Sequence, residues 1–269
     1  MGEKLYVFGT GNAITTHCYN TCFAIDSGDD YFMVDAGGGN GILKILEDMC
    51  ISCSHIHNIF VSHEHSDHVL GIVWMVRIIG SMINSAQYEG ICNLYCHAEL
   101  KTTITQLVKL TLGKKIYGLL GDKIIIHAVE DGESREILGH RVNFFDIHSS
   151  KAKQFGFNYL LGDGQLLSFT GDEPLNPACT QYVSGCQWLL AEAFCLYDEK
   201  DIFKPYEKHH STVKDASLLA QSLGVPNTVL WHTEDKNIKN RKELYTAEAK
   251  KYYNGNIYVP DDGEIILLN

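Results

Sequence analysis

Three histidines, a glutamate and an aspartate stand within the six residues His63-Glu64-His65-Ser66-Asp67-His68. Imidazole nitrogens and carboxylate oxygens are common ligands of zinc and similar divalent ions. In an extended or turning segment, His63 and His65 project to the same side and can grip one ion. Asp67 and His68, after a turn, would face a second ion. The structural alternative is a polar loop in which Asp67 caps a helix that begins near Val69, but three histidines in this order favour metal binding.

Three further candidate ligands each follow a predicted strand. His148 follows the strand at 141–146, Asp172 follows the strand at 165–169, and His232 follows the strand at 228–231. Taken singly, each could be an ordinary turn or cap residue. Loops at strand ends are where layered folds build their sites, so we expect the three side chains to join the histidine cluster.

The elements that must position these residues are mostly strands. Short apolar and β-branched runs between glycine or Asp/Gly breaks predict strands, and apolar residues at helical spacing predict helices. The predicted strands cover residues 5–8, 21–25, 31–34, 58–61, 123–128, 141–146, 155–161, 165–169, 188–192, 228–231, 256–259 and 264–268. The predicted helices cover residues 41–49, 69–79, 98–110, 212–223 and 241–252. Strands interrupted by helices predict mixed sheets covered by helices, and without a linker or repeat we expect one domain over residues 1–269.

Composition restricts the partners and the compartment. The net charge of −11 counts against a broadly basic surface for nucleic acid, although a few lysines around one cleft are compatible with it. The N-terminus lacks the features of a signal peptide, and no run approaches the roughly 18 uninterrupted apolar residues that span a bilayer. We expect a soluble cytoplasmic protein that has no membrane partner, with its nine cysteines as buried thiols.

The His-x-His-x-Asp-His motif at residues 63–68 resembles that of the metallo-β-lactamase-fold hydrolases. The resemblance implies an α/β (α+β) fold, an αββα four-layer sandwich of two mixed β-sheets flanked by helices. It also implies two divalent ions, with zinc expected and manganese or iron as alternatives, and a water between them that becomes hydroxide near neutral pH. By this resemblance Asp35 supports the ligand loop. The first ion would be held by His63, His65 and His148, the second by Asp67, His68 and His232, and Asp172 would bridge them.

Three further matches are similar to the ribonuclease Z-like branch of these hydrolases. Residues 189–194 resemble its strand ending in His-Glu-Ala-Thr, although Ala191 replaces the histidine and the threonine is absent. His210-Ser211-Thr212 matches its His-Ser-Thr motif, and His148 followed by Gly156-Phe157 resembles its His…Gly-Tyr element. The resemblance runs from about residue 5 to the C-terminus.

This branch implies catalytic roles for three residues: Asp67, His210 and Glu192. A histidine held by a glutamate can donate a proton to a departing alkoxide, so His210 would be the general acid and Glu192 its orienting partner. The alternative to this general-acid role is that His210 is an ordinary surface residue beside a helix cap. His209 is expected to be a bystander because only His210 precedes Ser-Thr.

One departure from the branch concerns its long Gly-rich and basic arm, which binds transfer RNA. The interval from His148 to Asp172 is 24 residues and consists mostly of two predicted strands, so it leaves no room for the arm. Four lysines (Lys101, Lys109, Lys114 and Lys115) lie in a segment that looks helical and lacks the arm's composition.

The favoured hypothesis is therefore a phosphodiesterase for a small or short nucleotide diester, such as a cyclic nucleotide. A transfer-RNA 3′-end endoribonuclease is the second hypothesis. Hydrolysis of a lactone, thioester, sulfate ester or β-lactam is a third, and a non-catalytic metal-binding scaffold is a fourth. The family also implies a possible homodimer.

Overall fold

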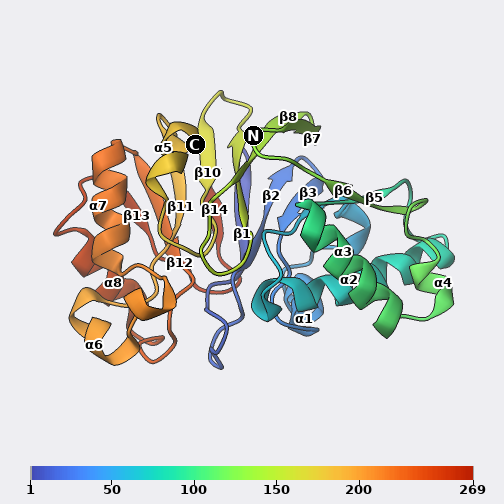
Figure 1. Ribbon diagram of the computed structural model, residues 1–269, viewed down its shortest axis with the longest axis horizontal. Helices are drawn as coiled ribbons and strands as arrows, with labels where there is room; N and C mark the ends of the chain where they lie inside the picture. The colour runs from blue at the N-terminus through green and yellow to red at the C-terminus, as the bar shows by residue number, and fades with distance from the viewer. Residues whose placement is uncertain (1, 269) are drawn as a thin grey trace.

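Two seven-stranded mixed sheets face each other, and helices cover the outer side of each (Figure 1). The computed structural model describes residues 2–268. The first sheet has the spatial order β14 (Ile265–Leu267), β1 (Lys4–Gly9), β2 (Cys22–Ser27), β3 (Asp30–Val34), β4 (Asn58–Phe60), β5 (Cys92–Cys96), β6 (Ile124–Ala128). The second has the order β13 (Asn256–Tyr258), β12 (Asn227–Trp231), β11 (Trp188–Glu192), β10 (Leu166–Phe169), β9 (Phe155–Leu160), β8 (His140–Asp146), β7 (Ser134–Ile137). The predicted αββα sandwich is confirmed.

Helices from the N-terminal part pack on the first sheet, and helices from the C-terminal part pack on the second (Figure 1). The first set is α1 (Gly41–Asp48), α2 (Ser66–Asn84), α3 (Ala98–Thr111) and α4 (Lys114–Tyr117). The second set is α7 (Val213–Leu223) and α8 (Arg241–Ala249). Short helices are α5 (Thr180–Val183) and α6 (Lys200–Phe203), with 3-10 turns η1 (Cys53–His55), η2 (Pro177–Cys179), η3 (Tyr197–Glu199) and η4 (Tyr206–Lys208).

Alternation along the strands divides the core into layers. In β1, Leu5 and Val7 join the core between the sheets, whereas Phe8 joins the core beneath the helices. The core between the sheets is rich in aromatic rings: the Phe23 and Trp231 centroids, one from each sheet, lie 4.7 Å apart. Burial of such rings is strongly favourable, so the sheets form a firm base for the loops at their edge.

Helix α2 is long and apolar enough to cross a membrane by length and composition alone, but half of its apolar window is buried in the protein. Its residues Ile72, Met75 and Ile79 are fully enclosed in the core against the first sheet. We therefore assign α2 to the core.

The structure corrects the predicted elements in three places. Helix α2 begins at Ser66, with His65 in the cap position, so Asp67 lies in its first turn and does not cap it. Strand β5 was not predicted because its Cys-Asn-Leu-Tyr-Cys sequence has little intrinsic strand preference and is held by pairing with β4 and β6. Strand β7 was also missed, because it is exposed and polar and exists through its hairpin with β8.

Candidate active site

The candidate site lies where strands of both sheets end. His63 comes after β4 of the first sheet, and Asp172 comes after β10 of the second. Glu192 is the last residue of β11, and His232 directly follows β12. His232 has a φ of 57°, a left-handed conformation that few residues other than glycine adopt. Backbone strain of this kind is held in place only where the surroundings demand it, often at functional sites.

His63, His65 and Asp172 form one group of potential ligand atoms, which we call the first position. Nε2 of His63 lies 2.9 Å from Nδ1 of His65 and 3.6 Å from Oδ2 of Asp172. Two ring nitrogens and a carboxylate oxygen that converge in this way match the ligand set of a divalent ion.

Asp67, His68 and His232 form another group, which we call the second position. Nε2 of His68 lies 3.3 Å from Oδ2 of Asp67 and is buried without a hydrogen-bond partner. Oδ2 of Asp172 lies 3.7 Å from Nε2 of His68 and 3.6 Å from Nε2 of His232. One oxygen of Asp172 therefore faces both positions, as a bridging ligand would.

Asp35 orients the ligand histidines from behind. Its Oδ2 accepts hydrogen bonds from Nδ1 of His68 at 2.8 Å and from Oγ of Ser62 at 2.7 Å. The Ser62 hydroxyl can in turn accept from Nδ1 of His63 at 2.9 Å. Because both Nδ1 atoms are occupied in this way, the Nε2 lone pairs are turned toward the two positions.

Close packing fixes the distance between Asp35 and α2. Gly71 lies so near the Asp35–Ala36 turn that an added Cβ would stand 1.8 Å from the carbonyl oxygen of Ala36. The backbone N–H of Ala36 donates to the carbonyl of His68 at 3.2 Å. The absence of a side chain at residue 71 thus brings the first turn of α2 within hydrogen-bonding reach of Asp35.

The electrostatics of the buried groups fit a cation. Burial opposes the charge on Asp172, but the neighbouring rings of His63, His232 and His68 outweigh it and hold the pKa of Asp172 well below its usual value. Burial likewise opposes charge on His68, yet the carboxylates of Asp67 and Asp35 raise its pKa well above 6.5. A proton on His68 thus compensates buried carboxylates that a metal ion would otherwise neutralise. The donor set and the unpaired Nε2 of His68 both suit divalent ions.

The structure does not bring His148 to either position. Its side chain is 50% exposed, and its nearest carboxylate is Asp146, 3.9 Å from Nδ1. The residue has a left-handed backbone with φ of 56° and lines another pocket, together with Ser150 and His209. Among residues 2–268, neither group of converging ligand atoms contains His148.

Gln154 occupies the space beside the first position, and sequence reasoning missed it. The residue directly precedes β9 and is 1% exposed. Its Nε2 lies 2.6 Å from Oδ1 of Asp172 and 2.7 Å from Nδ1 of His63. An amide carries no signal of metal chemistry, and only its place two residues before Gly156-Phe157 could have drawn attention to it.

His210 and Glu192 lie together beside the two positions. Nδ1 of His210 lies 2.9 Å from the carbonyl oxygen of Asp172 and 3.6 Å from Oε2 of Glu192. The hydrogen bond that orients the ring is therefore to a backbone carbonyl, and the carboxylate supports it electrostatically. No hydrogen bond within residues 2–268 engages Nε2 of His210, which leaves that atom available to a ligand. His210 is 9% exposed, so the surface alternative is wrong.

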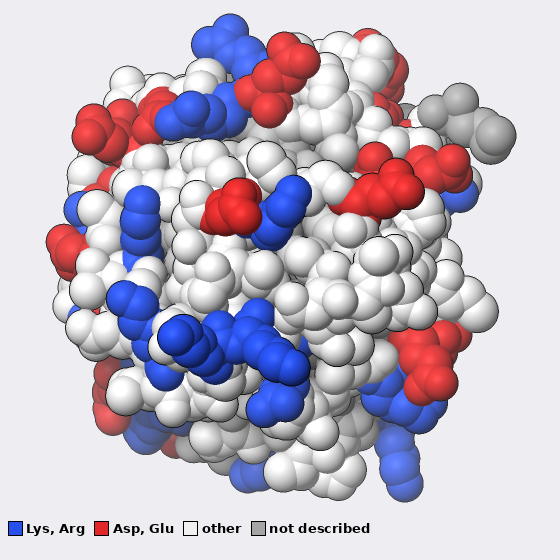
Figure 2. Space-filling model, turned by 90° about the vertical axis from the view of Figure 1, so that its right-hand side faces the viewer, with Lys and Arg blue, Asp and Glu red and all other residues white. Residues whose placement is uncertain are grey.

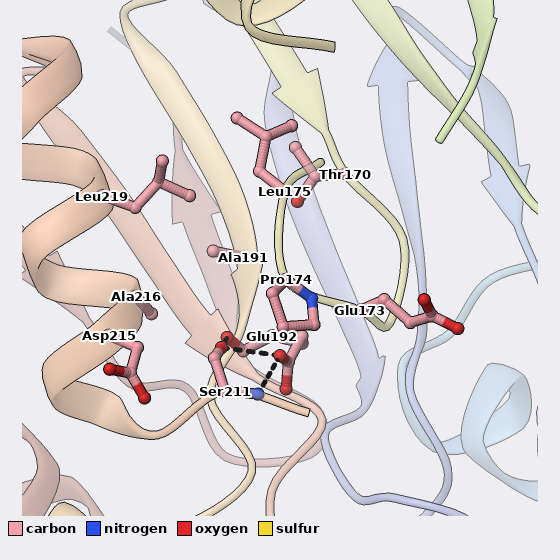
Figure 3. A pocket seen from close by; sticks show the side chains of 10 residues that line it. All are labelled: Thr170, Glu173, Pro174, Leu175, Ala191, Glu192, Ser211, Asp215, Ala216 and Leu219. Carbon is pink, nitrogen blue, oxygen red and sulfur yellow. Dashed lines mark hydrogen bonds between the residues drawn. The ribbon is translucent and has the colours of Figure 1, made fainter. Parts of the chain in front are cut away.

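Glu192 is itself fixed by the segment before α7. Its Oε1 accepts from the backbone N–H of Ser211 at 2.5 Å and from the Ser211 hydroxyl at 2.6 Å (Figure 3). Burial raises the pKa of Glu192, and the contact with His210 partly offsets this. A cavity of about 120 Å³ beside the carboxylate is lined by the small side chains of Ala191 and Ala216 (Figure 3). Thr212, which follows Ser211 in the chain, forms the capping box of α7 with Asp215.

An open pocket of about 480 Å³ joins both positions to His210. Two lysines, Lys151 and Lys208, line it, and neither was singled out from the sequence. The ring of Phe194 stacks on His210 with centroids 4.8 Å apart and an angle of 4° between the planes. Ile14, 80% exposed, adds an apolar rim from the loop between β1 and β2. The pocket thus combines ligand groups, cationic side chains and apolar surface.

Comparison with known proteins agrees with this architecture. The family model of the Anti-Pycsar protein Apyc1 matches residues 3–258. A ribonuclease Z of Methanococcus aeolicus is 32% identical, over 98% of this chain and 94% of the relative. The metallo-β-lactamase-fold protein YhfI from Bacillus subtilis superposes with a TM-score of 0.79 at 16% identity, over 99% of both chains. The short form of human tRNase Z gives 0.75 at 16% identity, over 98% of both chains. The chain therefore belongs to the Anti-Pycsar protein Apyc1 family and is a ribonuclease Z-like, metal-dependent hydrolase of the metallo-β-lactamase fold.

Proposed function

We propose that this hydrolase is a binuclear phosphodiesterase that acts on a small diester such as a cyclic nucleotide. The observation that carries the proposal is the position of His210, which lies beside both ligand groups and is backed by Glu192. An acid in this place is useful where the leaving oxygen has a high pKa, as the ribose oxygen of a phosphodiester does. Esters that release a stabilised leaving group gain less from it.

Two divalent ions, with zinc the first candidate and manganese or iron the alternatives, would be held at the first and second positions. When bound, they would supply Lewis-acid polarisation of the phosphoryl group and an activated water at neutral pH. The six proposed ligands converge in the two groups: His63, His65, Asp67, His68, Asp172 and His232.

The protein's own side chains would do the remaining work. Nδ1–H of His210 is held by the carbonyl of Asp172, so a proton on Nε2 can pass to the departing oxygen. The carboxylate of Glu192 lies 3.6 Å from Nδ1 and faces the same side of the ring as that carbonyl bond. Lys151 and Lys208 can contact phosphate oxygens in the pocket, and Phe194 keeps the face of His210 dry.

The dimensions of the pocket support a small substrate. Its volume of about 480 Å³ is that of a small-molecule site. Between His148 and Asp172 the chain forms β9 and β10 and their short connections, so this interval carries no long arm. A cytoplasmic location, one domain over residues 1–269 and a homodimer stay part of the proposal.

Cleavage of transfer-RNA precursors is the second candidate, because a curated relative is a ribonuclease Z. Basic side chains also gather on the end of the molecule made by α2 to α4, the face that Figure 2 presents. Helices α3 and α4 contribute Lys101, Lys109, Lys114 and Lys115 to this part of the chain. Phosphate contacts need several such groups together, so this end would be the place for an RNA to dock.

A comparison of hydrolysis rates on a panel of substrates tests the proposal. We expect the metal-loaded protein to hydrolyse cyclic nucleotides and bis(p-nitrophenyl) phosphate faster than nitrocefin or a lactone. Faster cleavage of a precursor transfer RNA at its 3′ trailer than of any small diester would favour the second candidate instead. Preference for the lactone or nitrocefin would contradict both.

The variant His210→Ala tests the acid. General acids contribute about 10²- to 10⁴-fold, so we expect losses in that range on a cyclic nucleotide and a much smaller loss with the good leaving group p-nitrophenolate. His209→Ala is the matched control, because the neighbouring ring points to Ser150, 3.0 Å from Nδ1, and not to the ligand groups. Equal losses on both substrates would remove the acid role from His210.

A further inference from the structure

The two positions differ in the protein groups available to them. The second position is formed by Asp67, His68 and His232, and Asp172 adds an oxygen that faces it. The first position is formed by two histidines and the same shared oxygen. The third histidine that the family resemblance implied, His148, lies half-exposed on another pocket with His209 and Ser150.

Gln154 stands beside two of the residues that form the first position. It is enclosed at 1% exposure and contacts two of the three ligands, Asp172 and His63. Its Oε1 also accepts the backbone N–H of Asp172 at 3.3 Å. The amide therefore bridges the loops that carry the two ligands.

The orientation of this amide is set by its partners. The nitrogen, not the oxygen, must face the carboxylate of Asp172, because two oxygens at 2.6 Å would repel each other. An N–H group donates hydrogen bonds and has no lone pair for a metal ion. Gln154 thus acts on the ligands and does not itself bind an ion.

The hydrogen bond from Gln154 occupies one of the two oxygens of the Asp172 carboxylate, which faces both positions. Oδ1 of Asp172 is engaged by Gln154, and Oδ2 is left to face the rings of both positions. The second position has its own carboxylate in Asp67, whereas the first has none. Anionic ligands raise the affinity of a site for a divalent cation, so the two positions are unequal.

We propose that Gln154 takes the place of the third histidine at the first position and holds the Asp172 carboxylate by a hydrogen bond, so that this position binds its divalent ion more weakly than the second and without His148. The inference depends on the metal centre of the proposed function. The inference is tested by metal content and metal affinity, so a failure of the protein to hydrolyse diesters would not contradict it.

The decisive comparison is His148→Ala against His65→Ala. Full-length protein is loaded with zinc, dialysed against a graded series of chelator concentrations and measured for zinc by elemental analysis. We expect the wild type to release its zinc in two steps, with equal amounts in each. His148→Ala should give the same two steps, and His65→Ala should lose the step at low chelator. Because His148 is exposed, its replacement leaves folding intact. Loss of a zinc step in His148→Ala would overturn the proposal, and so would release of both ions from the wild type in one step.

Gln154→Leu tests the positioning role, because leucine keeps much of the volume and removes the hydrogen bonds. We expect the chelator concentration of the first step to fall by about 10-fold, as for other groups that orient ligands, while the second step stays in place. Gln165→Leu, the same change in the turn before β10, is the control and should shift neither step. An unchanged first step in folded Gln154→Leu protein, judged by circular dichroism, would contradict the role; if that variant does not fold, Gln154→Met takes its place with the same readout and the same expected fall.

Discussion

The first position draws its histidines from the segment before α2, whereas the second draws on the first turn of α2 and the end of β12. His68 is in a helix, is enclosed at 1% exposure and is bonded through Nδ1 to Asp35. His65 sits in the cap position, and its Nδ1 contacts only His63 among the described hydrogen bonds. Similar ligand types are therefore supported to different degrees.

This difference shows how a fold distributes precision over two neighbouring groups of candidate ligands. Residues on regular elements are held more exactly than residues on loops. The second position is anchored by helix, strand and buried carboxylate, whereas the first relies on the hydrogen bond that Ser62 accepts from His63 and on the one that Gln154 donates to Asp172. We expect the second position to retain its ion under conditions that empty the first.

We expect the largest effect from Asp172→Ala, which should remove the difference in metal binding between the two positions. Because Oδ2 of Asp172 faces both positions, we expect zinc content after dialysis to fall at both, and diester hydrolysis to fall to background. Elemental analysis of the dialysed protein measures this, with the exposed turn residue Asp122 replaced by alanine as control. Retention of a full equivalent of zinc would mean that Asp172 does not serve both positions.

Asp35→Asn should narrow the difference in metal affinity between the two positions. The carboxylate of Asp35 accepts directly from His68 and reaches His63 only through Ser62. Losing such a support weakens metal binding by about 10- to 100-fold, and we expect the larger part of this loss at the second position. Calorimetric titration of zinc into metal-free protein would resolve the two affinities. A loss confined to the first position would contradict the direct role on His68.

We expect pH to change the metal affinity of the two positions to different extents, with a smaller effect than either substitution. In the metal-free protein the pKa of His68 is raised well above 6.5, so an ion entering the second position must displace a proton. Burial holds the pKa of His63 well below 6.5, so this ligand of the first position is already neutral. Affinity at the second position should therefore increase as the pH rises above 6.5, and affinity at the first should change less. Titration in buffers of different ionisation enthalpy would count the protons released; equal release at both positions would contradict this assignment.

Sequence patterns were sufficient for the layers and for most of the ligands. The apolar runs before His63 and His232 predicted the strands that carry these two residues. The motif at residues 63–68 specified five side chains whose types have few uses other than metal binding, and the structure brings four of them into the two groups.

What the sequence could not supply was the geometry of connections. In the turn after β8, His148 has a left-handed backbone and a half-exposed side chain, and no pattern in residues 146–150 predicts this. Gln154 and Lys208 owe their places to packing across distant segments. Strand β5 was missed for the same reason, since pairing with β4 and β6 outweighs its weak intrinsic preference.

The ligands of each position come from both halves of the sandwich: His63 and His68 follow β4 of the first sheet, and Asp172 and His232 follow strands of the second. An ion bound there fastens the halves together, and its binding free energy adds to that of the folded state. A chain deprived of metal would unfold more often and meet proteases more often. We therefore expect zinc supply to set the cellular lifetime of this protein as well as its activity.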